Sequence, residues 1–287
     1  MRNRAAALTV IAVAFAARAQ SPALSVSTTS GLRLHTIVAD AQPALALQIP
    51  GYDTTTPAIR ILFPEHVTVV PHGAEPRHLY LHDAPPRAVA EAPRWLQRGD
   101  TLGYERQLAD DVQLSARAIL APDGIRIRYV LTNHSSRDFD AATVVTDPRM
   151  LGALHDAKLE RTWVHLSSGF ELLASETPVT PARGPARYLA SYAWPIPAQR
   201  AEHRADGITY FTKSRRVDAP FIATTSVDGQ WVVASYSRDA GNVWSNPDLT
   251  CQHVDPSAPL AAGATATLDI RLIVLRGGVQ DAFARAR

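Results

Sequence analysis

Apolar and polar residues alternate along much of this chain, and a period of two residues is typical of half-buried β-strands. In residues 125–131, four apolar side chains alternate with Arg126 and Arg128, and residues 268–274 repeat the pattern. The same criterion predicts further strands at residues 33–38, 44–49, 59–63, 67–70, 77–82, 112–120, 139–146, 158–166, 187–193, 208–213, 220–227 and 231–237.

Glycine-containing turns separate several of these segments. A Pro-Asp-Gly sequence at 122–124 and an Asp-Gly sequence at 228–229 each lie between two expected strands. Both are hairpin signals, because glycine reaches positive φ without a Cβ clash. Helical spacing is clear at residues 279–286, where apolar side chains recur four positions apart. The pattern predicts an all-β fold: a large antiparallel two-sheet sandwich, resembling a supersandwich, with a short C-terminal helix. It forms one domain over residues 20–287.

The first nineteen residues have the pattern of an export signal. Arg2 and Arg4 precede an apolar run at residues 5–17, and Ala-Arg-Ala at 17–19 supplies a small-x-small cleavage site. No later segment approaches 18 consecutive apolar residues, so we expect no membrane span after cleavage. No cysteine lies near the cleavage site to carry a lipid. We therefore expect a periplasmic or extracellular protein.

The charge balance changes when the signal is removed. The chain has 29 basic and 27 acidic side chains, and the signal contains three arginines and no acid. The remaining arginines are spread along the chain without a cluster, which argues against a nucleic-acid partner. Cys251 is the single cysteine, so no intrachain disulfide can form, and a buried, unreactive thiol is the more common role. No phosphate loop, Cys-x-x-Cys pair or G-x-S-x-G elbow occurs, and no cofactor is expected.

Residues 242–256, which we expect to form a loop, concentrate the side chains best suited to chemistry. His253 and Asp255 are two positions apart, so on an extended backbone they share one face, where the carboxylate would orient the imidazole as an acid/base pair. We expect this pair to face solvent. Trp244 offers a flat apolar face for a sugar ring, and Asn242 and Asn246 offer hydrogen bonds for vicinal hydroxyls. The alternative is structural: Asn and Asp before Pro are ordinary turn residues, and a tryptophan in a sandwich usually belongs to the core.

A second candidate site lies in residues 158–166. On a strand, Arg161, Trp163 and His165 share one face, where arginine would neutralise the carboxylate of an acidic sugar while a neutral histidine accepts the adjacent proton. A solvated arginine beside a core tryptophan is the simpler alternative. Tyr192 would form an aromatic wall with Tyr188, although core packing explains the same spacing.

The remaining histidines do not predict a metal site. His78 and His82 would share a strand face but lie about 13 Å apart by strand rise, too far to bind one ion. A loop-formed site that uses His72 or Glu75 stays open as an alternative.

Two resemblances extend these observations. Trp-Ser-Asn-Pro at 244–247, Cys-Gln-His-Val-Asp-Pro at 251–256 and the strand at 265–275 resemble the C-terminal segment of a family of exported bacterial proteins. That resemblance implies no reaction. Residues 126–134, a strand ending in an Asn-containing turn, resemble the galactose-mutarotase-like supersandwich, a fold of sugar epimerases, polysaccharide lyases and glycosidase-associated domains. The His/Glu pattern of true mutarotases is missing, so no catalytic residue is carried over.

Together these observations predict an exported protein whose partner is a carbohydrate. As an enzyme it would be a lyase or epimerase acting on a sugar or uronic acid unit, without a metal. The proposed catalytic residues are His253, Asp255 and His165, and the proposed substrate-binding residues are Trp244, Asn242, Asn246, Arg161 and Tyr192. The alternative is a non-catalytic glycan-binding or envelope-associated β-sandwich protein.

Overall fold

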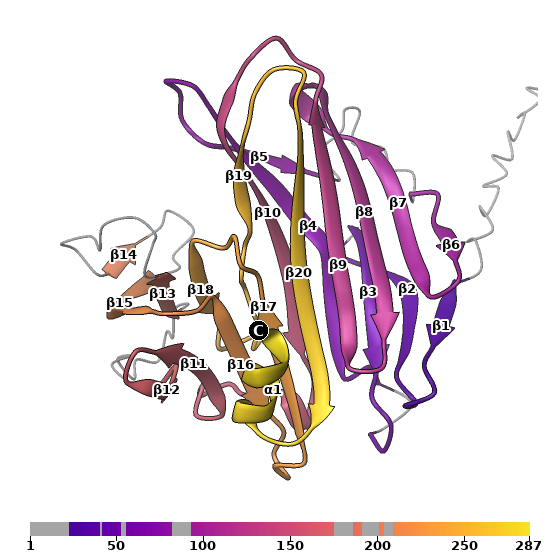
Figure 1. The fold of residues 1–287 in the computed structure, drawn as a ribbon, viewed down its shortest axis with the longest axis vertical. Coiled ribbons are helices and arrows are strands. Elements are labelled where there is room, and N and C mark those ends of the chain that lie inside the picture. Colours follow the sequence, from indigo (N-terminus) through magenta and orange to yellow (C-terminus); the bar gives the residue numbers. More distant parts are fainter. Residues whose placement is uncertain are drawn as a thin grey trace, which may run out of the picture.

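A computed structural model describes residues 23–40, 42–52, 56–81, 93–174, 186–190, 201–203 and 209–287. These residues form two large antiparallel sheets, a smaller sheet beside them and one C-terminal helix (Figure 1). The predicted fold class, an all-β two-sheet sandwich with a short C-terminal helix, is confirmed. The export signal at residues 1–19 and Tyr192 lie outside the described residues. Among the described residues, no helix is long and apolar enough to cross a membrane.

The seven-stranded sheet has the order β1-β2-β3-β4-β10-β19, and β5 pairs with β4. Its strands are β1 (Ser25–Ser27), β2 (Arg33–Ala39), β3 (Gln42–Gln48), β4 (Ile59–Pro71), β5 (Arg77–Tyr80), β10 (Phe139–Met150) and β19 (Ser257–Leu260). The two strands predicted at 59–63 and 67–70 are one continuous strand, β4. The pairing of β4 with β10 shifts register between Val145 and Asp147.

The nine-stranded sheet has the order β12-β11-β16-β17-β20-β9-β8-β7-β6. Its strands are β6 (Leu96–Arg98), β7 (Thr101–Gln107), β8 (Val112–Ala121), β9 (Gly124–Asn133), β11 (Thr162–Leu166), β12 (Gly169–Leu172), β16 (Phe221–Thr225), β17 (Trp231–Tyr236) and β20 (Thr265–Arg276). The hairpins predicted at 122–124 and 228–229 connect β8 to β9 and β16 to β17. Gly124 has φ +132°, and a Cβ there would lie 2.0 Å from the carbonyl oxygen of Leu272, so only glycine fits.

The smaller sheet has the order β14-β15-β13-β18, with β13 and β15 parallel. Its strands are β13 (Ala186–Ala190), β14 (Ala201–His203), β15 (Thr209–Val217) and β18 (Asn242–Ser245). Residues 242–245 were expected to belong to a loop, and their place in β18 corrects that expectation. Two short 3₁₀ turns, Ala109–Asp111 and Gly152–Leu154, connect strands.

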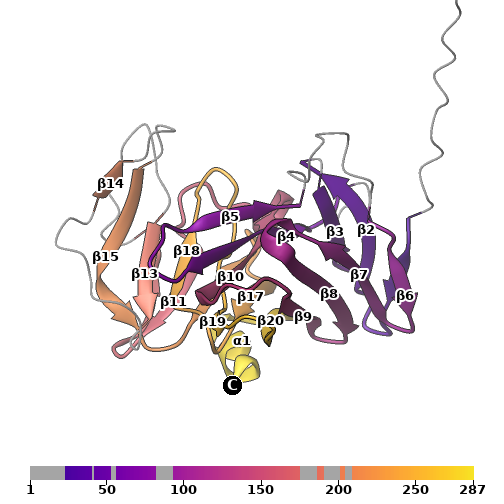
Figure 2. The ribbon, with the colours of Figure 1, turned by 90° about the horizontal axis from the view of Figure 1, so that it is seen from above.

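The core lies between the two large sheets, because alternate side chains of both sheets point inward. One continuous cluster contains Ile61 and Val67 of β4 together with Leu114 of β8 and Ile127 of β9. The predicted helix, α1 (Val279–Ala286), has the expected bounds and packs on the outer face of the nine-stranded sheet (Figure 2). Strands β16 and β17 are therefore covered on both faces, which explains their nearly unbroken burial.

Asn133, at the end of β9, joins two loops that leave different sheets. Its fully buried amide donates to the carbonyl oxygens of Arg137 at 2.7 Å and Leu260 at 3.2 Å, and its Oδ1 accepts from the Ser135 backbone N–H at 3.0 Å. Buried carbonyls without a donor destabilise a fold, so this side chain fixes how β9 passes to β10.

We expect Asn133→Ala to lower the free energy of unfolding by about 3 kcal/mol, because buried carbonyl groups lose their donors. Thr132→Ala is the matched control: its hydroxyl pairs with Thr265 at 3.1 Å at the surface, and we expect a loss below about 1 kcal/mol. Urea denaturation followed by circular dichroism measures both. Equal losses would show that the Asn133 network is not what stabilises this junction.

Candidate functional site

A buried cluster of ionisable side chains lies where β4 and β10 meet the segment that follows β18. At its centre is His253, which is only 1% exposed to solvent. The His253 Nε2 atom lies 3.5 Å from Asp147 Oδ1, and the Nδ1 atom lies 3.4 Å from Asp255 Oδ1. The imidazole is thus held between two buried carboxylates.

Trp244 covers one face of the His253 ring. The two rings are stacked, with centroids 3.5 Å apart and an angle of 7° between their planes. The indole Nε1 donates to Asp255 Oδ2 at 2.9 Å, so this carboxylate contacts the indole with one oxygen and approaches the imidazole with the other. The structure therefore brings together Trp244, His253 and Asp255, as the sequence predicted for one site.

The expectation that this pair faces solvent is wrong. The backbones of Trp244 and His253 pair as an antiparallel bridge, and Cys251 forms a second bridge with Arg149 of β10. These bridges turn the segment inward against the seven-stranded sheet, which leaves Asp255 only 5% exposed. Proline spacing indicated an extended backbone here, but not that other strands would cover it.

Asp147 of β10 completes the cluster, and the sequence analysis did not identify it as a site residue. Its Oδ2 accepts a hydrogen bond from Arg149 Nε at 2.6 Å, and Arg149 also reaches Asp40 at 2.6 Å. Burial alone would raise the pKa of Asp147, but His253 and Arg149 outweigh burial and hold this pKa below its usual value. Its one sequence signal is its place in the Thr-Asp-Pro-Arg stretch at 146–149, which begins at the end of the strand predicted at 139–146.

The acidic groups around His253 raise the pKa of its imidazole. Burial alone would lower it, but Cys251 and the carboxylates of Asp255 and Asp147 raise it well above its ordinary value. The two carboxylates stabilise the imidazolium form, because opposite charges attract strongly where water is excluded.

Glu65 and His66 of β4 connect this cluster to the surface. Their side chains are 30% and 14% exposed, and His66 Nδ1 lies 3.9 Å from Glu65 Oε2. The His66 ring contacts the rings of His78 and Tyr80 on β5, with centroids 4.9 Å and 5.1 Å away. Burial raises the pKa of Glu65, whereas burial and the neighbouring His78 lower the pKa of His66 to about 4.

Cys251 lies beside His253 and is buried, the more common of the two roles considered for it. Its Sγ accepts a hydrogen bond from the Asn246 backbone N–H at 3.2 Å, and burial raises the pKa of its thiol. The donor atoms of Asp147, Cys251 and His253 all lie within 4.8 Å of one another. This is the arrangement of residue types that binds metal ions, and the sequence spacing did not indicate it.

Two of the other predicted site residues have separate structural partners. His165 of β11 bonds Asp218 at 2.6 Å and stacks on Phe283 of α1, with ring centroids 4.1 Å apart. Arg161 donates to the backbone carbonyls of Thr225 and His155. Arg161 and His165 therefore have partners of their own: Arg161 bonds to the end of β16 and to the segment before β11, and His165 contacts α1.

The predicted asparagines also differ in their environments. Asn246 accepts the Asp248 backbone N–H at 3.1 Å, which is the turn geometry considered as its alternative role. Asn242 Oδ1 is buried and has no hydrogen-bond partner within the described part of the chain. His72, one of the open metal candidates, instead pairs with Asp140 at 3.0 Å on the surface.

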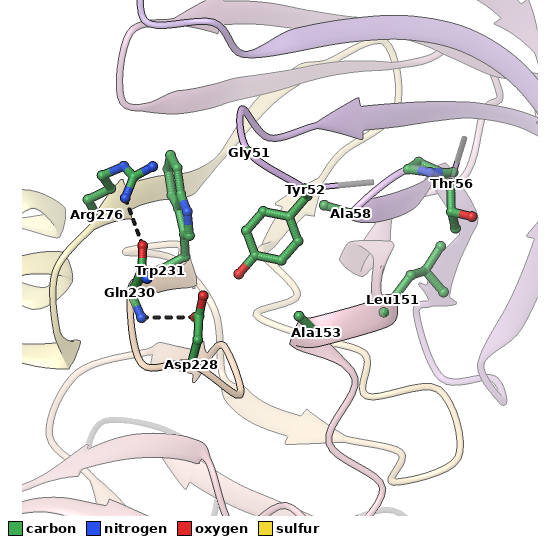
Figure 3. Close-up of a pocket in the computed structure, with 12 residues that line it drawn as sticks. Gly51, Tyr52, Thr56, Ala58, Leu151, Ala153, Asp228, Gln230, Trp231 and Arg276 are labelled. Atoms are coloured by element: carbon green, nitrogen blue, oxygen red, sulfur yellow. Dashed lines mark hydrogen bonds between the residues drawn. The ribbon is translucent and has the colours of Figure 1, made fainter. Parts of the chain in front are cut away.

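A pocket of about 490 Å³ lies at the end of the sandwich where the β3–β4 loop meets the β16–β17 turn (Figure 3). Tyr52 and Trp231 meet edge to face across it, with ring centroids 6.3 Å apart. The Arg276 guanidinium lies 4.8 Å from the Trp231 ring centroid and donates to Gln230 at 2.9 Å. Asp228 also lines the pocket. The sequence identified this region only as a turn.

No protein-family model and no curated protein matches the chain. Solved structures do match: a galactose mutarotase-like protein from Lactobacillus casei is 13% identical with a TM-score of 0.50, over 88% of this chain and 100% of that one. A galactose mutarotase related enzyme from Lactobacillus acidophilus is 10% identical with a TM-score of 0.50, over 88% and 97%. The α-N-acetylgalactosaminidase NagBb from Bifidobacterium bifidum, in complex with GalNAc, is 10% identical with a TM-score of 0.53, over 91% and 37%.

At these identities the matches define the fold and not the activity. The chain is an all-β sandwich, and more particularly it has the galactose mutarotase-like fold. The resemblance inferred from residues 126–134 is thereby supported at the level of the fold. The resemblance of residues 244–256 to a family of exported bacterial proteins stays a prediction.

His66 predicts how stability depends on pH. Its pKa is about 4 in the folded protein and 6.5 ordinarily, so between these values the unfolded chain takes up the proton first. The contribution of His66 to stability is therefore present above pH 6.5 and lost as the pH falls towards 4, by about 3 kcal/mol.

We expect His66→Gln to reduce the loss of unfolding free energy between about pH 7 and about pH 4.5 by about 2 to 3 kcal/mol. Urea titrations at both pH values measure it. His72→Gln is the control, because the Asp140 hydrogen bond raises the pKa of exposed His72 instead. An unchanged pH dependence in His66→Gln would show that His66 titrates normally in the folded state.

Proposed function

We propose that this protein is an exported carbohydrate-active enzyme that moves a proton at a sugar carbon, as an epimerase or lyase does. The galactose mutarotase-like fold supports a sugar as the partner, because solved structures with this fold include mutarotase-like proteins and a glycosidase. The observation that carries the proposal is the pair Glu65 and His66, two partly exposed groups whose pKa values are shifted in opposite directions.

Proton transfer at neutral pH needs one group that holds a proton and one that accepts it. Burial raises the pKa of Glu65, so its carboxyl group holds a proton more tightly than usual, and the lowered pKa of His66 leaves a neutral imidazole. The two pKa values are shifted in opposite directions by burial, and altered proton affinities of neighbouring groups mark a candidate functional site. His66 Nδ1 is buried and has no hydrogen-bond partner among the described residues. In the proposed reaction the other ring nitrogen of His66, Nε2, accepts the proton from the sugar and Glu65 returns one.

His253 acts from behind this pair, and not on the sugar itself. At 1% exposure its ring has no free edge for a substrate. Its charge interacts with both Glu65 and His66, opposing the rise in the pKa of Glu65 and contributing to the fall in the pKa of His66. We assign Asp255 the orienting role that the sequence suggested, since its Oδ1 lies 3.4 Å from His253 Nδ1 and its Oδ2 accepts a hydrogen bond from the Trp244 indole. His253 and Asp255 are thus positioning residues.

The contacts of Arg161 also bear on the substrate class. Arg161 suggested a uronic acid, but its guanidinium is bonded to backbone carbonyls. Arg161 therefore gives no reason to prefer an acidic sugar over a neutral one, and both belong in the assay.

We expect Glu65→Gln and His66→Gln each to lower turnover at least about 100-fold, because each removes one half of the acid/base pair. Interconversion of aldose anomers and epimers by NMR, and release of unsaturated uronate by absorbance, measure the two reactions. His72→Gln is the control and should keep the full rate, because His72 is a surface histidine that lies beside a carboxylate, as His66 does. Full activity in Glu65→Gln or in His66→Gln would contradict the assignment of this pair as acid and base.

The competing function is non-catalytic glycan binding, and the Tyr52–Trp231 pocket favours it. The pocket combines the Tyr52 and Trp231 rings with the polar side chains of Asp228, Gln230 and Arg276 (Figure 3). Such a mixture of apolar and polar groups is suited to binding a sugar. Sugar binding without turnover, lost in Gln230→Ala and kept in Glu65→Gln, would establish this function instead. Turnover lost in Glu65→Gln and kept in Gln230→Ala would exclude it.

A further inference from the structure

We infer that Asp147, Cys251 and His253 form a binding site for Zn²⁺ or a divalent transition-metal ion of similar softness. The inference is independent of the proposed reaction, because it concerns which ion the buried cluster holds and not what happens to a sugar.

The donor set fits such an ion. Thiolate sulfur, imidazole nitrogen and carboxylate oxygen are the three ligand types of Zn²⁺, and a thiolate disfavours Mg²⁺ and Ca²⁺. Three protein ligands leave one position of a tetrahedral ion for another group, which is the pattern of catalytic rather than structural zinc sites.

Strand pairing brings the three donors together. Asp147 and Arg149 are alternate residues of β10, and Cys251 pairs with Arg149 across an isolated bridge. His253 follows two positions later, and its N–H is fixed by the Trp244 carbonyl at 3.0 Å. Donor atoms from two segments about a hundred residues apart thus fall within 4.8 Å of one another.

The spacing of the donors supports a shared ion. His253 Nε2 and Asp147 Oδ1 are 3.5 Å apart, longer than the 2.7–3.2 Å of an ordinary N–H···O hydrogen bond. Two ligand atoms each about 2.0–2.1 Å from a tetrahedral ion lie about 3.3 Å apart, close to the observed separation.

Asp147 Oδ1 supplies a second, independent observation. The residue is 2% exposed, and this oxygen has no hydrogen-bond partner among the described residues. A buried carboxylate oxygen without a donor is costly, and an ion between it and His253 Nε2 would satisfy it. His253 Nδ1 and Asp255 Oδ1 also have no hydrogen-bond partner among the described residues, and Asp147 Oδ1 is the one of the three atoms that lies beside His253 Nε2.

The surroundings have the form expected around metal ligands. A ligating histidine commonly turns its other nitrogen to a carboxylate that fixes the ring, and Asp255 lies 3.4 Å from His253 Nδ1. Asp255 is held in turn by Trp244 Nε1. The Asn246 N–H directed at Cys251 Sγ stabilises negative charge on the sulfur.

Binding replaces protons and requires no redox step. The divalent ion takes the place of the proton on His253 Nε2 and of the thiol proton of Cys251, and both protons pass to the solvent. In the metal-free protein the imidazolium supplies the positive charge between the carboxylates, so the cluster holds a cationic centre in both forms.

The test uses the mature full chain, stripped with a chelator and titrated with Zn²⁺ and separately with Co²⁺. We expect one ion per chain, proton release in calorimetry and a thiolate-to-cobalt charge-transfer band in the absorption spectrum. Cys251→Ser should remove the band and weaken zinc binding at least about 100-fold, and Asp255→Asn should weaken binding about 10-fold. His72→Ala, which removes a surface histidine–carboxylate pair, should bind as the unchanged protein does.

Cobalt bound without a charge-transfer band, or zinc bound equally well by Cys251→Ser, would place the ion elsewhere and overturn the inference. Failure to bind one equivalent of zinc would overturn it as well. If Cys251→Ser does not fold, the cobalt spectrum of the unchanged protein decides the question alone. All these measurements are made without sugar, so they do not depend on whether the proposed reaction occurs.

Discussion

The position of the His253 imidazole between Asp147 and Asp255 is the constraint on which this molecule's C-terminal half depends. A buried charge is tolerated only when its partners are in place, because removing it from water costs several kcal/mol. One partner lies two residues away and the other on β10, about a hundred residues earlier. The pairing therefore fixes the approach of residues 244–255 to the centre of the seven-stranded sheet.

Residues 251–253 link both large sheets. The Gln252 side chain donates to the Val233 carbonyl at 2.9 Å and accepts from the Ser235 hydroxyl at 3.0 Å, both on β17. Its backbone N–H bonds to the Pro148 carbonyl on β10 at 3.1 Å. His253, the next residue, points to Asp147 of the opposite sheet. Residues 251–253 thus position the ionisable cluster and also join the two large sheets. The geometry of the site therefore depends on the same contacts that stabilise the sandwich.

The sequence predicts the parts of this arrangement that depend on local physics. Alternation indicates the long strands, Asp-Gly pairs indicate two hairpins, and a four-residue spacing indicates α1, because each signal depends on residues close together in the chain. The grouping of Trp244, His253 and Asp255 follows from the same local reasoning. Their burial does not, because it is imposed by bridges to β10, and Asp147 belongs to the site only through pairing across a hundred residues. Glu65 and His66 were likewise not identified, since their altered proton affinities arise from burial beside residues distant in sequence.

The cationic centre at His253 also explains why an acid and a base can lie side by side on β4. Without it, the carboxylates of Asp147 and Asp255 would add two uncompensated negative charges near Glu65 and raise its proton affinity further. The same positive charge opposes protonation of His66, together with burial and His78. A single buried charge therefore lowers the pKa of both neighbours, whereas burial raises the pKa of Glu65 and lowers that of His66. The exchange of that charge between a proton and a metal ion would leave its sign unchanged, so the acid/base pair at the surface and the ion site beneath it are compatible in one protein.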